Sequence, residues 1–98
     1  MSKILVATDF SPLSDRALRR AILTARQIAA ELVLFHALDD DLPDRLLSMQ
    51  RTVSTELLTE LAETITASDG IPCSYRLAQG DPFRALIDTA REIAPGII

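Results

Sequence analysis

Apolar residues along this chain fall into three short runs separated by longer amphipathic stretches. Residues 4–7 and 32–35 are continuously apolar, as expected for strands that are covered on both faces. In residues 71–77 apolar and polar positions alternate, which predicts a strand with one less buried face. Pro72, near the start of that run, favours an edge strand because proline cannot donate to a neighbouring strand.

The stretches between these runs carry helix start and stop signals. Ser11 followed by Pro12, and Asp81 followed by Pro82, each read as an N-cap and a first helical residue. Pro43 marks the entry to a middle helix, which Asp69-Gly70 ends, and Pro95-Gly96 ends the last one.

The apolar positions of each stretch recur at helical spacing, so each helix is expected to bury one stripe. The predicted stripes are Leu18, Ala21, Ile22, Ala25, Ile28 and Ala29; then Leu46, Leu47, Val53, Leu57, Leu58, Leu61 and Ile65; then Phe83, Leu86, Ile87, Ala90 and Ile93.

The resulting order is βαβαβα, and Ile97-Ile98 reads as the start of a fourth strand. Strands separated by helices pair in parallel through right-handed crossovers, so the fold class is α/β with a parallel sheet. We therefore expect residues 1–98 to form a single domain that is incomplete relative to its fold. The alternative is that Ile97-Ile98 only cap the last helix.

Composition narrows the class of protein. Nearly half of the 98 residues are apolar and the formal charge is −4, which disfavours nucleic-acid binding, a function that usually requires a basic excess. No apolar run approaches a membrane span, and four apolar residues after Lys3 are too few for a signal peptide. We expect a cytoplasmic protein that contacts neither nucleic acid nor membrane.

The junction that ends the first strand carries the clearest chemistry. Thr8-Asp9 follows the apolar run, and the helix start at Ser11-Pro12 comes two residues later. In open α/β sheets, ligands bind at this carboxyl edge of the strands. A carboxylate there can accept hydrogen bonds from a ribose hydroxyl or an adenine amine, but it repels phosphate. Asp9 could instead only cap the turn, and Thr8 could be an ordinary strand residue.

Three segments in this order resemble the universal stress protein family: residues 3–11 (KILVATDFS), residues 32–37 (LVLFHA), and Gly80-Asp81-Pro82 before an amphipathic helix. The similarity extends over essentially the whole chain. It implies a parallel α/β sandwich, usually a homodimer, with an adenine-nucleotide pocket in one branch of the family.

The resemblance also implies site residues. Thr8 and Asp9 match the end of the first strand, where nucleotide-binding members hold adenosine. Ala37 matches the residue after the second-strand histidine, where the backbone meets adenine, and Gly80 matches the glycine near the end of the third strand.

One family feature is missing from these residues. The ATP-binding branch carries a phosphate motif, G-x-x-G, nine residues, then G-S or G-T, after its fourth strand. Glycine amides at a helix N-terminus are a physical means of holding phosphates. The glycines here, Gly70, Gly80 and Gly96, stand singly. ATP with Mg²⁺ is thus a candidate cofactor, although these residues do not include the family's phosphate-binding loop.

The remaining reactive residues suggest packing rather than chemistry. His36 ends the second strand and is expected to be packed and hydrogen-bonded, although its titration near neutral pH would suit an acid or base. Cys73 is expected to be a small buried hydrophobe, and one His and one Cys cannot supply a zinc site. The acidic run 39–41 is expected to be a solvated loop, with Mg²⁺ contact as the alternative.

Three functions remain open. The first is a stress-response module that binds an adenine nucleotide such as ATP at the sheet edge. The second is a non-nucleotide-binding module of the same family that acts by dimerisation. The third, an enzyme of the wider adenine-nucleotide α-hydrolase superfamily, is disfavoured because neither a Ser-Gly-Gly loop nor a His-x-x-His motif is present. No catalytic constellation is apparent, so any ATP hydrolysis would be slow and incidental.

Overall fold

The computed structural model describes residues 2–93 as three strands alternating with three helices. The elements are β1 (Lys3–Ala7), α1 (Pro12–Ile28), β2 (Glu31–Leu38), α2 (Asp44–Asp69), β3 (Cys73–Gln79) and α3 (Pro82–Ile93). The predicted α/β class and βαβαβα order are confirmed. The predicted end of the third helix at Pro95-Gly96 and the fourth strand at Ile97-Ile98 lie outside the described residues.

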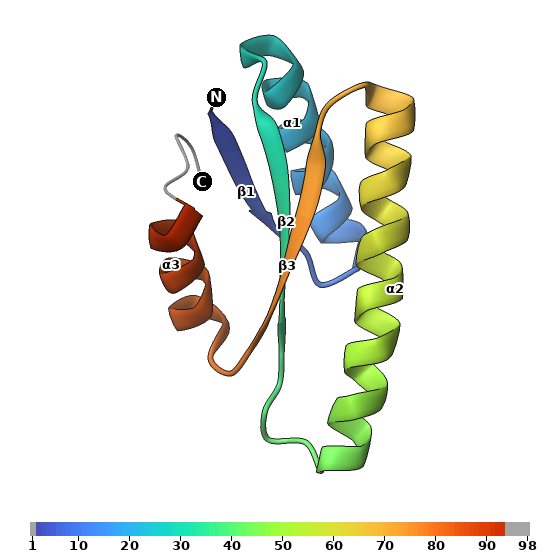
Figure 1. Cartoon of the computed structure of the whole chain (residues 1–98), viewed down its shortest axis with the longest axis vertical. Helices are drawn as coiled ribbons and strands as arrows, with labels where there is room; N and C mark the ends of the chain where they lie inside the picture. The colour runs from blue at the N-terminus through green and yellow to red at the C-terminus, as the bar shows by residue number, and fades with distance from the viewer. Residues whose placement is uncertain (1, 94–98) are drawn as a thin grey trace.

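The three strands form one parallel sheet in the order β1-β2-β3, so β2 lies in the centre (Figure 1). Leu34 of β2 is in register with Val6 of β1 and with Tyr75 of β3. Because all three strands run the same way, their carboxyl ends meet at one edge of the sheet. The loops that follow them are therefore brought together there.

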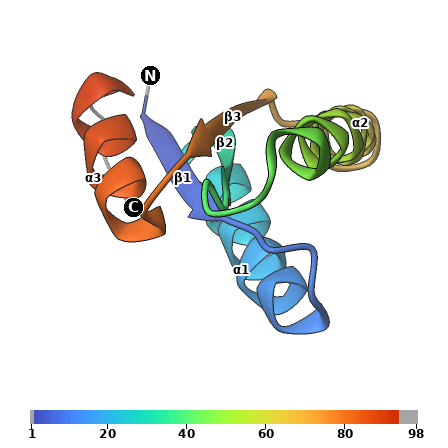
Figure 2. The same ribbon diagram turned by 90° about the horizontal axis from the view of Figure 1, so that it is seen from below.

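Helices cover the two faces of the sheet unequally. Helices α1 and α2 lie on one face and α3 lies on the other (Figure 2). The larger core, between the sheet and α1 and α2, includes Leu32, Leu34 and Leu58, all fully buried. The smaller core joins Leu5, Val33 and Phe35 to the half-buried face of α3. Residues of β2 enter both cores, which explains its continuously apolar sequence.

Each helix begins close to its predicted signal, and α2 also ends at its predicted one. The Ser11 hydroxyl accepts from the Ser14 amide at the start of α1, and Pro12 is the first helical residue. An Asp81 carboxylate oxygen accepts from the Phe83 amide at the start of α3. Gly70, at φ +68°, ends α2 in the left-handed conformation that glycine adopts without strain.

The predicted helical stripes were only partly right. In α1, Leu18, Ile22 and Ala25 are buried, whereas Ile28 is exposed and Ala29 lies beyond the last helical residue. In α3, Phe83 and Ile87 are exposed and the buried residue is Thr89. The reason is that each helix packs against only one face of the sheet. The apolar residues of the helix cover a wider part of its circumference than the part that touches the sheet.

The prediction for α2 was wrong for three of the seven residues of its stripe. Leu46, Val53 and Leu57 are exposed, while the buried face consists of Ser54, Leu58, Ala62 and Ile65. Small residues on this face allow the helix to approach the sheet closely. Figure 1 shows that the first turns of α2 extend past the sheet, so their apolar side chains have no strand to cover.

The third strand behaves as an edge strand, as its alternation predicted. Within residues 2–93 it pairs only with β2. It begins two residues later than predicted and extends to Gln79, while Pro72 contributes only its carbonyl, which accepts from the Leu32 amide at 2.9 Å. Cys73 is half-buried against the larger core, and burial, with the charge of Glu31, raises the pKa of its thiol to about 11.

Among the described residues, no helix combines the length and the apolarity that crossing a membrane requires.

Candidate functional site

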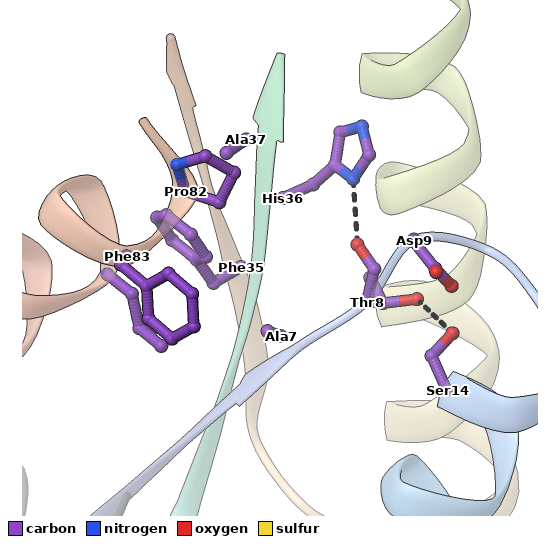
Figure 3. Close-up of a pocket in the computed structure, with 10 residues that line it drawn as sticks. Ala7, Thr8, Asp9, Ser14, Phe35, His36, Ala37, Pro82 and Phe83 are labelled. Carbon is purple, nitrogen blue, oxygen red and sulfur yellow. Dashed lines mark hydrogen bonds between the residues drawn. The ribbon is translucent and has the colours of Figure 1, made fainter. Parts of the chain in front are cut away.

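A cavity of about 360 Å³ lies at the carboxyl edge of the sheet. Its walls come from the ends of β1 and β2 and the first turns of α1 and α3 (Figure 3). It falls at the low end of the usual size range of small-molecule pockets. The lining residues are Ala7, Thr8, Asp9, Ser14, Phe35, His36, Ala37, Pro82, Phe83 and Leu86.

Thr8 holds the turn between β1 and α1 in place. Its amide donates to the Phe35 carbonyl at 2.8 Å, which continues the pairing of β1 with β2 by one residue. Its buried hydroxyl accepts from the Phe10 amide at 3.1 Å and lies 3.2 Å from the Ser14 hydroxyl. Thr8 is thus a structural residue of the turn as well as a lining residue of the cavity.

Asp9 presents an exposed carboxylate at the cavity. One of its oxygens accepts from the Ser11 amide at 2.9 Å, and hydrogen bonding from the Ser11 side chain and backbone lowers the pKa of the Asp9 carboxyl to about 2. The group is therefore ionised at neutral pH and retains acceptor capacity for a ligand. Asp9 caps the turn, as one interpretation of the sequence predicted, and it also lines the cavity, while its contact with a nucleoside stays a prediction.

His36 and Phe10 form the support behind this turn. The Nδ1 atom of His36 lies 2.7 Å from the Thr8 carbonyl oxygen, and its ring lies 4.6 Å from that of Phe10, centroid to centroid. Because a carbonyl only accepts, Nδ1 carries the proton in this contact. Phe10 has φ +66°, a conformation that is uncommon for a side chain of this size. The predicted packed and hydrogen-bonded histidine is confirmed, and it also lines the cavity.

The wall opposite Asp9 is apolar. Figure 3 shows Phe35 of β2 together with Pro82 and Phe83 of α3 on one side of the strand ends, and Asp9 on the other side. The Phe83 side chain is 80% exposed, so a large aromatic surface faces solvent beside the cavity. The cavity thus joins a carboxylate on one side to a flat hydrophobic surface on the other.

Three of the four predicted site residues line this cavity, namely Thr8, Asp9 and Ala37. Gly80 does not line it. Its amide donates to the Leu38 carbonyl at 3.0 Å, and its φ of +115° lets β3 turn into α3. A Cβ atom at this position would lie 3.7 Å from an Asp40 carboxylate oxygen, on the side of the acidic loop.

The sequence analysis missed the aromatic wall and Ser14. Phe83 was assigned to a buried stripe. It directly follows Pro82, in the first turn of α3, and it lines the cavity at the carboxyl edge of the sheet. Ser14 follows the N-cap Ser11 by three residues, so its position in the first turn of the helix could have indicated its proximity to Thr8.

No lysine or arginine lines the cavity among the residues that the structure describes. Asp39, Asp40 and Asp41 are all exposed, and oxygens of the three carboxylates lie within 4.8 Å of one another. Within the loop, the Asp41 amide donates to the Asp39 carboxylate at 2.9 Å. This matches a solvated acidic loop.

Comparison with known proteins agrees with this geometry. The family model described as the universal stress protein family matches residues 1–98. A solved member of that family from Burkholderia pseudomallei is 30% identical, with a TM-score of 0.83 over 98% of this chain and 78% of that one. A search of curated proteins found no match.

Two further solved structures share the fold. Universal stress protein UspA from Lactobacillus plantarum is 18% identical, with a TM-score of 0.83 over 95% of this chain and 70% of that chain. A universal stress protein solved in complex with cAMP is 24% identical, with a TM-score of 0.74 over 96% of this chain and 71% of that one. The match of the family model over residues 1–98, together with these folds, shows that the chain belongs to the universal stress protein family.

Proposed function

We propose that this chain binds an adenine nucleotide in the cavity at the carboxyl edge of its sheet, chiefly through the nucleoside part. The observation that carries the proposal is the pairing of an ionised, exposed Asp9 with the apolar wall of Phe35, Pro82 and Phe83 across one cavity. A nucleoside has matching parts, because its ribose hydroxyls donate and its base is flat and apolar on both faces.

Each wall has a distinct role in this proposal. Asp9 accepts from a ribose hydroxyl or from the adenine amine, while Thr8 and Ala37 line the base. The exposed ring of Phe83 offers a stacking surface, an interaction that contributes about 1–3 kcal/mol per base in nucleic-acid complexes. The geometry also supports a role for His36, whose contact with the Thr8 carbonyl holds the turn that carries Asp9.

A solved structure of similar fold also supports binding of an adenine nucleotide. A universal stress protein of similar fold, 24% identical, has been solved in complex with cAMP, an adenine nucleotide. The analogy concerns the fold, and this chain's own residues must supply the contacts.

The residues fit a nucleoside better than a triphosphate. Asp9 repels phosphate, and within residues 2–93 the cavity is lined by no cationic side chain that would attract it. ATP with Mg²⁺ remains one proposed ligand, held by its adenosine part with its phosphates directed away from Asp9. Affinity should therefore depend little on the number of phosphates.

Calorimetric titration of the chain with adenosine, AMP and Mg-ATP tests the proposal. We expect all three to bind with dissociation constants that agree within a few-fold. Asp9→Asn should weaken each by about 10- to 100-fold, since a hydrogen bond to a charged group contributes about 1.5–3 kcal/mol. Asp15→Asn is the matched control, because Asp15 is exposed in the first turn of α1 and does not line the cavity.

Two results would contradict this proposal. If no adenine compound binds at millimolar concentration, the cavity is not a nucleoside site. If Asp9→Asn and Asp15→Asn have the same effect, the site lies elsewhere.

A second candidate function is a dimerising interaction module that binds no nucleotide. The absence of a cationic side chain around the cavity, within the described part of the chain, favours it. This second function predicts that the chain self-associates and that calorimetry detects no binding of adenosine, AMP or Mg-ATP.

A further inference from the structure

The outer side of α1 carries a concentration of positive charge that the proposed nucleotide site does not use. Four of the ten cationic residues of the chain lie on this helix, and all are exposed arginines: Arg16, Arg19, Arg20 and Arg26. With Asp15 as its one acidic residue, α1 has a net charge of +3, whereas the rest of the chain carries −7 and the whole chain −4. The charge of α1 is therefore opposite to that of the rest of the molecule.

These arginines surround an exposed leucine. At about 100° per residue, Arg16 and Arg20 fall on one side of Leu23, and Arg19 and Arg26 fall on the other. The Leu23 side chain is 58% exposed. We call these five residues the arginine face. Its apolar centre and charged rim match the general anatomy of a protein–protein contact.

The arginine face has no structural role within the described part of the chain. The ion pair that forms within residues 2–93 joins Arg76 to Glu92, and none of the four guanidinium groups of α1 contacts a carboxylate there. The core uses the opposite side of the helix, whose buried residues are Leu18, Ile22 and Ala25. In Figure 2 the outer side of α1 points away from the sheet and from the other two helices.

This arrangement of charge opposes the fold slightly. Arg16 lies three residues before Arg19 and four before Arg20, and like charges at these spacings destabilise a helix. A partner that supplies carboxylates would remove this repulsion. The charge pattern is therefore better suited to a complex than to the free chain.

We propose that the arginine face binds an acidic segment of another protein. Its guanidinium groups pair with carboxylates of that segment, and Leu23 packs against an apolar side chain between them. The exclusive use of arginine favours carboxylates, because the planar guanidinium group can donate two parallel hydrogen bonds to one carboxylate. The proposal is independent of the nucleotide site, because none of these five residues lines the cavity.

The size of the arginine face favours a short acidic segment over a membrane or a nucleic acid. From Arg16 to Arg26 it extends about 15 Å, at 1.5 Å per residue. An extended anionic surface would also approach the acidic remainder of the chain and be repelled. A short segment would be attracted mainly by the arginines, because more distant exposed charges are screened beyond about 8 Å at physiological salt.

Fluorescence anisotropy with labelled synthetic peptides tests the proposal. The main probe is a peptide of about 15 residues with leucines between pairs of glutamates, long enough to cover the arginine face. We expect the 98-residue chain to bind it with a dissociation constant on the order of 10–100 µM, because the contact is small. Replacing every glutamate with glutamine should abolish binding, and replacing the leucines with serine should weaken it several-fold. Added salt should also weaken binding.

Variants of the chain locate the contact. Arg16→Gln combined with Arg20→Gln should weaken binding of the peptide by about five-fold, as expected for two exposed ion pairs. Leu23→Ser should have a similar effect through lost apolar contact. The matched control is Arg84→Gln combined with Arg91→Gln, which removes the same charge from exposed residues of α3, on the other face of the sheet. Circular dichroism checks that each variant is folded.

Several results would overturn the proposal. One is the absence of peptide binding at millimolar concentration, and another is an equal loss of binding in the Arg16/Arg20 and Arg84/Arg91 variants, which would indicate net charge alone. Tighter binding to phosphatidylserine vesicles or to single-stranded RNA, lost in the Arg16/Arg20 variant, would assign the arginine face to a phosphate-bearing partner. An assembly of the chain alone that this variant disperses would assign it to a second copy.

The nucleotide site can be tested separately in the same variant. Calorimetric titration with adenosine should be unchanged by Arg16→Gln combined with Arg20→Gln. Failure of the peptide experiment would therefore leave the proposed nucleotide site standing, and failure of the adenosine titration would leave the arginine face standing.

Discussion

Asp9 shows how one side chain can hold a turn in place and still remain exposed at a cavity. Its carboxylate accepts from the Ser11 amide and so closes the turn between β1 and α1, yet the side chain remains exposed at the cavity. The same hydrogen bonding lowers the pKa of the carboxyl to about 2. A lowered pKa means that the folded chain favours the ionised form. Asp9 thus stabilises the turn while keeping its negative charge available to a ligand.

This ionisation predicts a pH-dependent stability. The contribution of Asp9 should be fully present above the usual pKa of 3.8 and should be lost as the pH falls through about 2. Asp9→Asn keeps the acceptor oxygen but removes the charge. We expect it to lower the urea midpoint of unfolding near neutral pH and to approach the wild-type midpoint progressively on acidification from about pH 5 to about pH 3.

Asp15→Asn again serves as the control for losing one negative charge. The pKa assignment would be refuted by an Asp9→Asn difference in midpoint that stays constant over this pH range, or by one that increases as the pH falls.

Individual residues also mark where sequence-based reasoning was sufficient. Thr8 and Asp9 follow β1 directly and Ala37 lies near the end of the neighbouring β2, so parallel pairing brings all three to one edge. Gly80 follows the third strand but does not line the cavity, and a Cβ atom at this position would face Asp40 of the acidic loop. The exposure of Phe83 depends on where α3 lies on the sheet, which its sequence pattern does not indicate.

Among the elements, α2 is the one whose sequence is ambiguous. It carries two apolar faces, and periodicity merges them into a single broad stripe. The residues of α2 that are buried lie on the face that carries the small residues Ser54 and Ala62. The position of the helix relative to the strands selects that face, and this depends on contacts between residues far apart in sequence.

The ends of α1 and α2 differ in a way that can be measured. Both helices end in a left-handed residue, but α1 uses Ala29, at φ +55°, where α2 uses Gly70. An L-residue in this conformation costs about 1–2 kcal/mol, a cost that glycine avoids. The end of α1 was therefore not predicted, since the glycine that usually marks such an end is absent.

Separate substitutions at these two positions should change the free energy of unfolding in opposite directions. We expect Ala29→Gly to raise the free energy of unfolding by about 1 kcal/mol and Gly70→Ala to lower it by a similar amount. A Cβ at Gly70 would have nothing within 4 Å, so the second effect should come from the backbone alone. Urea unfolding of both variants measures the changes.

The double variant is the control for independence, because the two sites should contribute additively. A stability loss on Ala29→Gly would contradict the assigned backbone conformation, as it would indicate an ordinary helical residue at that position.

The whole molecule is organised around β2. This strand is paired on both sides and contributes to the cores on both faces, whereas β3 has one paired edge among residues 2–93. Three of the four buried residues of helix α2 lie in its second half, and its first turns extend past the sheet (Figure 1). Local stability should follow this distribution of contacts.

Native-state hydrogen exchange at low protein concentration should reveal that gradient. We expect the slowest amides in β2 and in the part of α2 around Leu58 and Ile65, and faster exchange around Leu46 and Val53. Uniform protection along α2 would contradict the structure.

The order of elements, the parallel sheet and the place of Thr8 and Asp9 at the sheet edge could be derived from the linear pattern of residues, whereas Ala37 was identified only through the family resemblance. These features depend on local periodicity, on capping residues and on the general rule that parallel strands end at one edge. Tertiary packing alone decided which face of α2 is buried, that Phe83 is exposed and that Gly80 lies outside the cavity lining. The physical reason is that burial depends on which surfaces pack together in three dimensions. An apolar residue in the sequence does not by itself indicate whether another surface will pack against it.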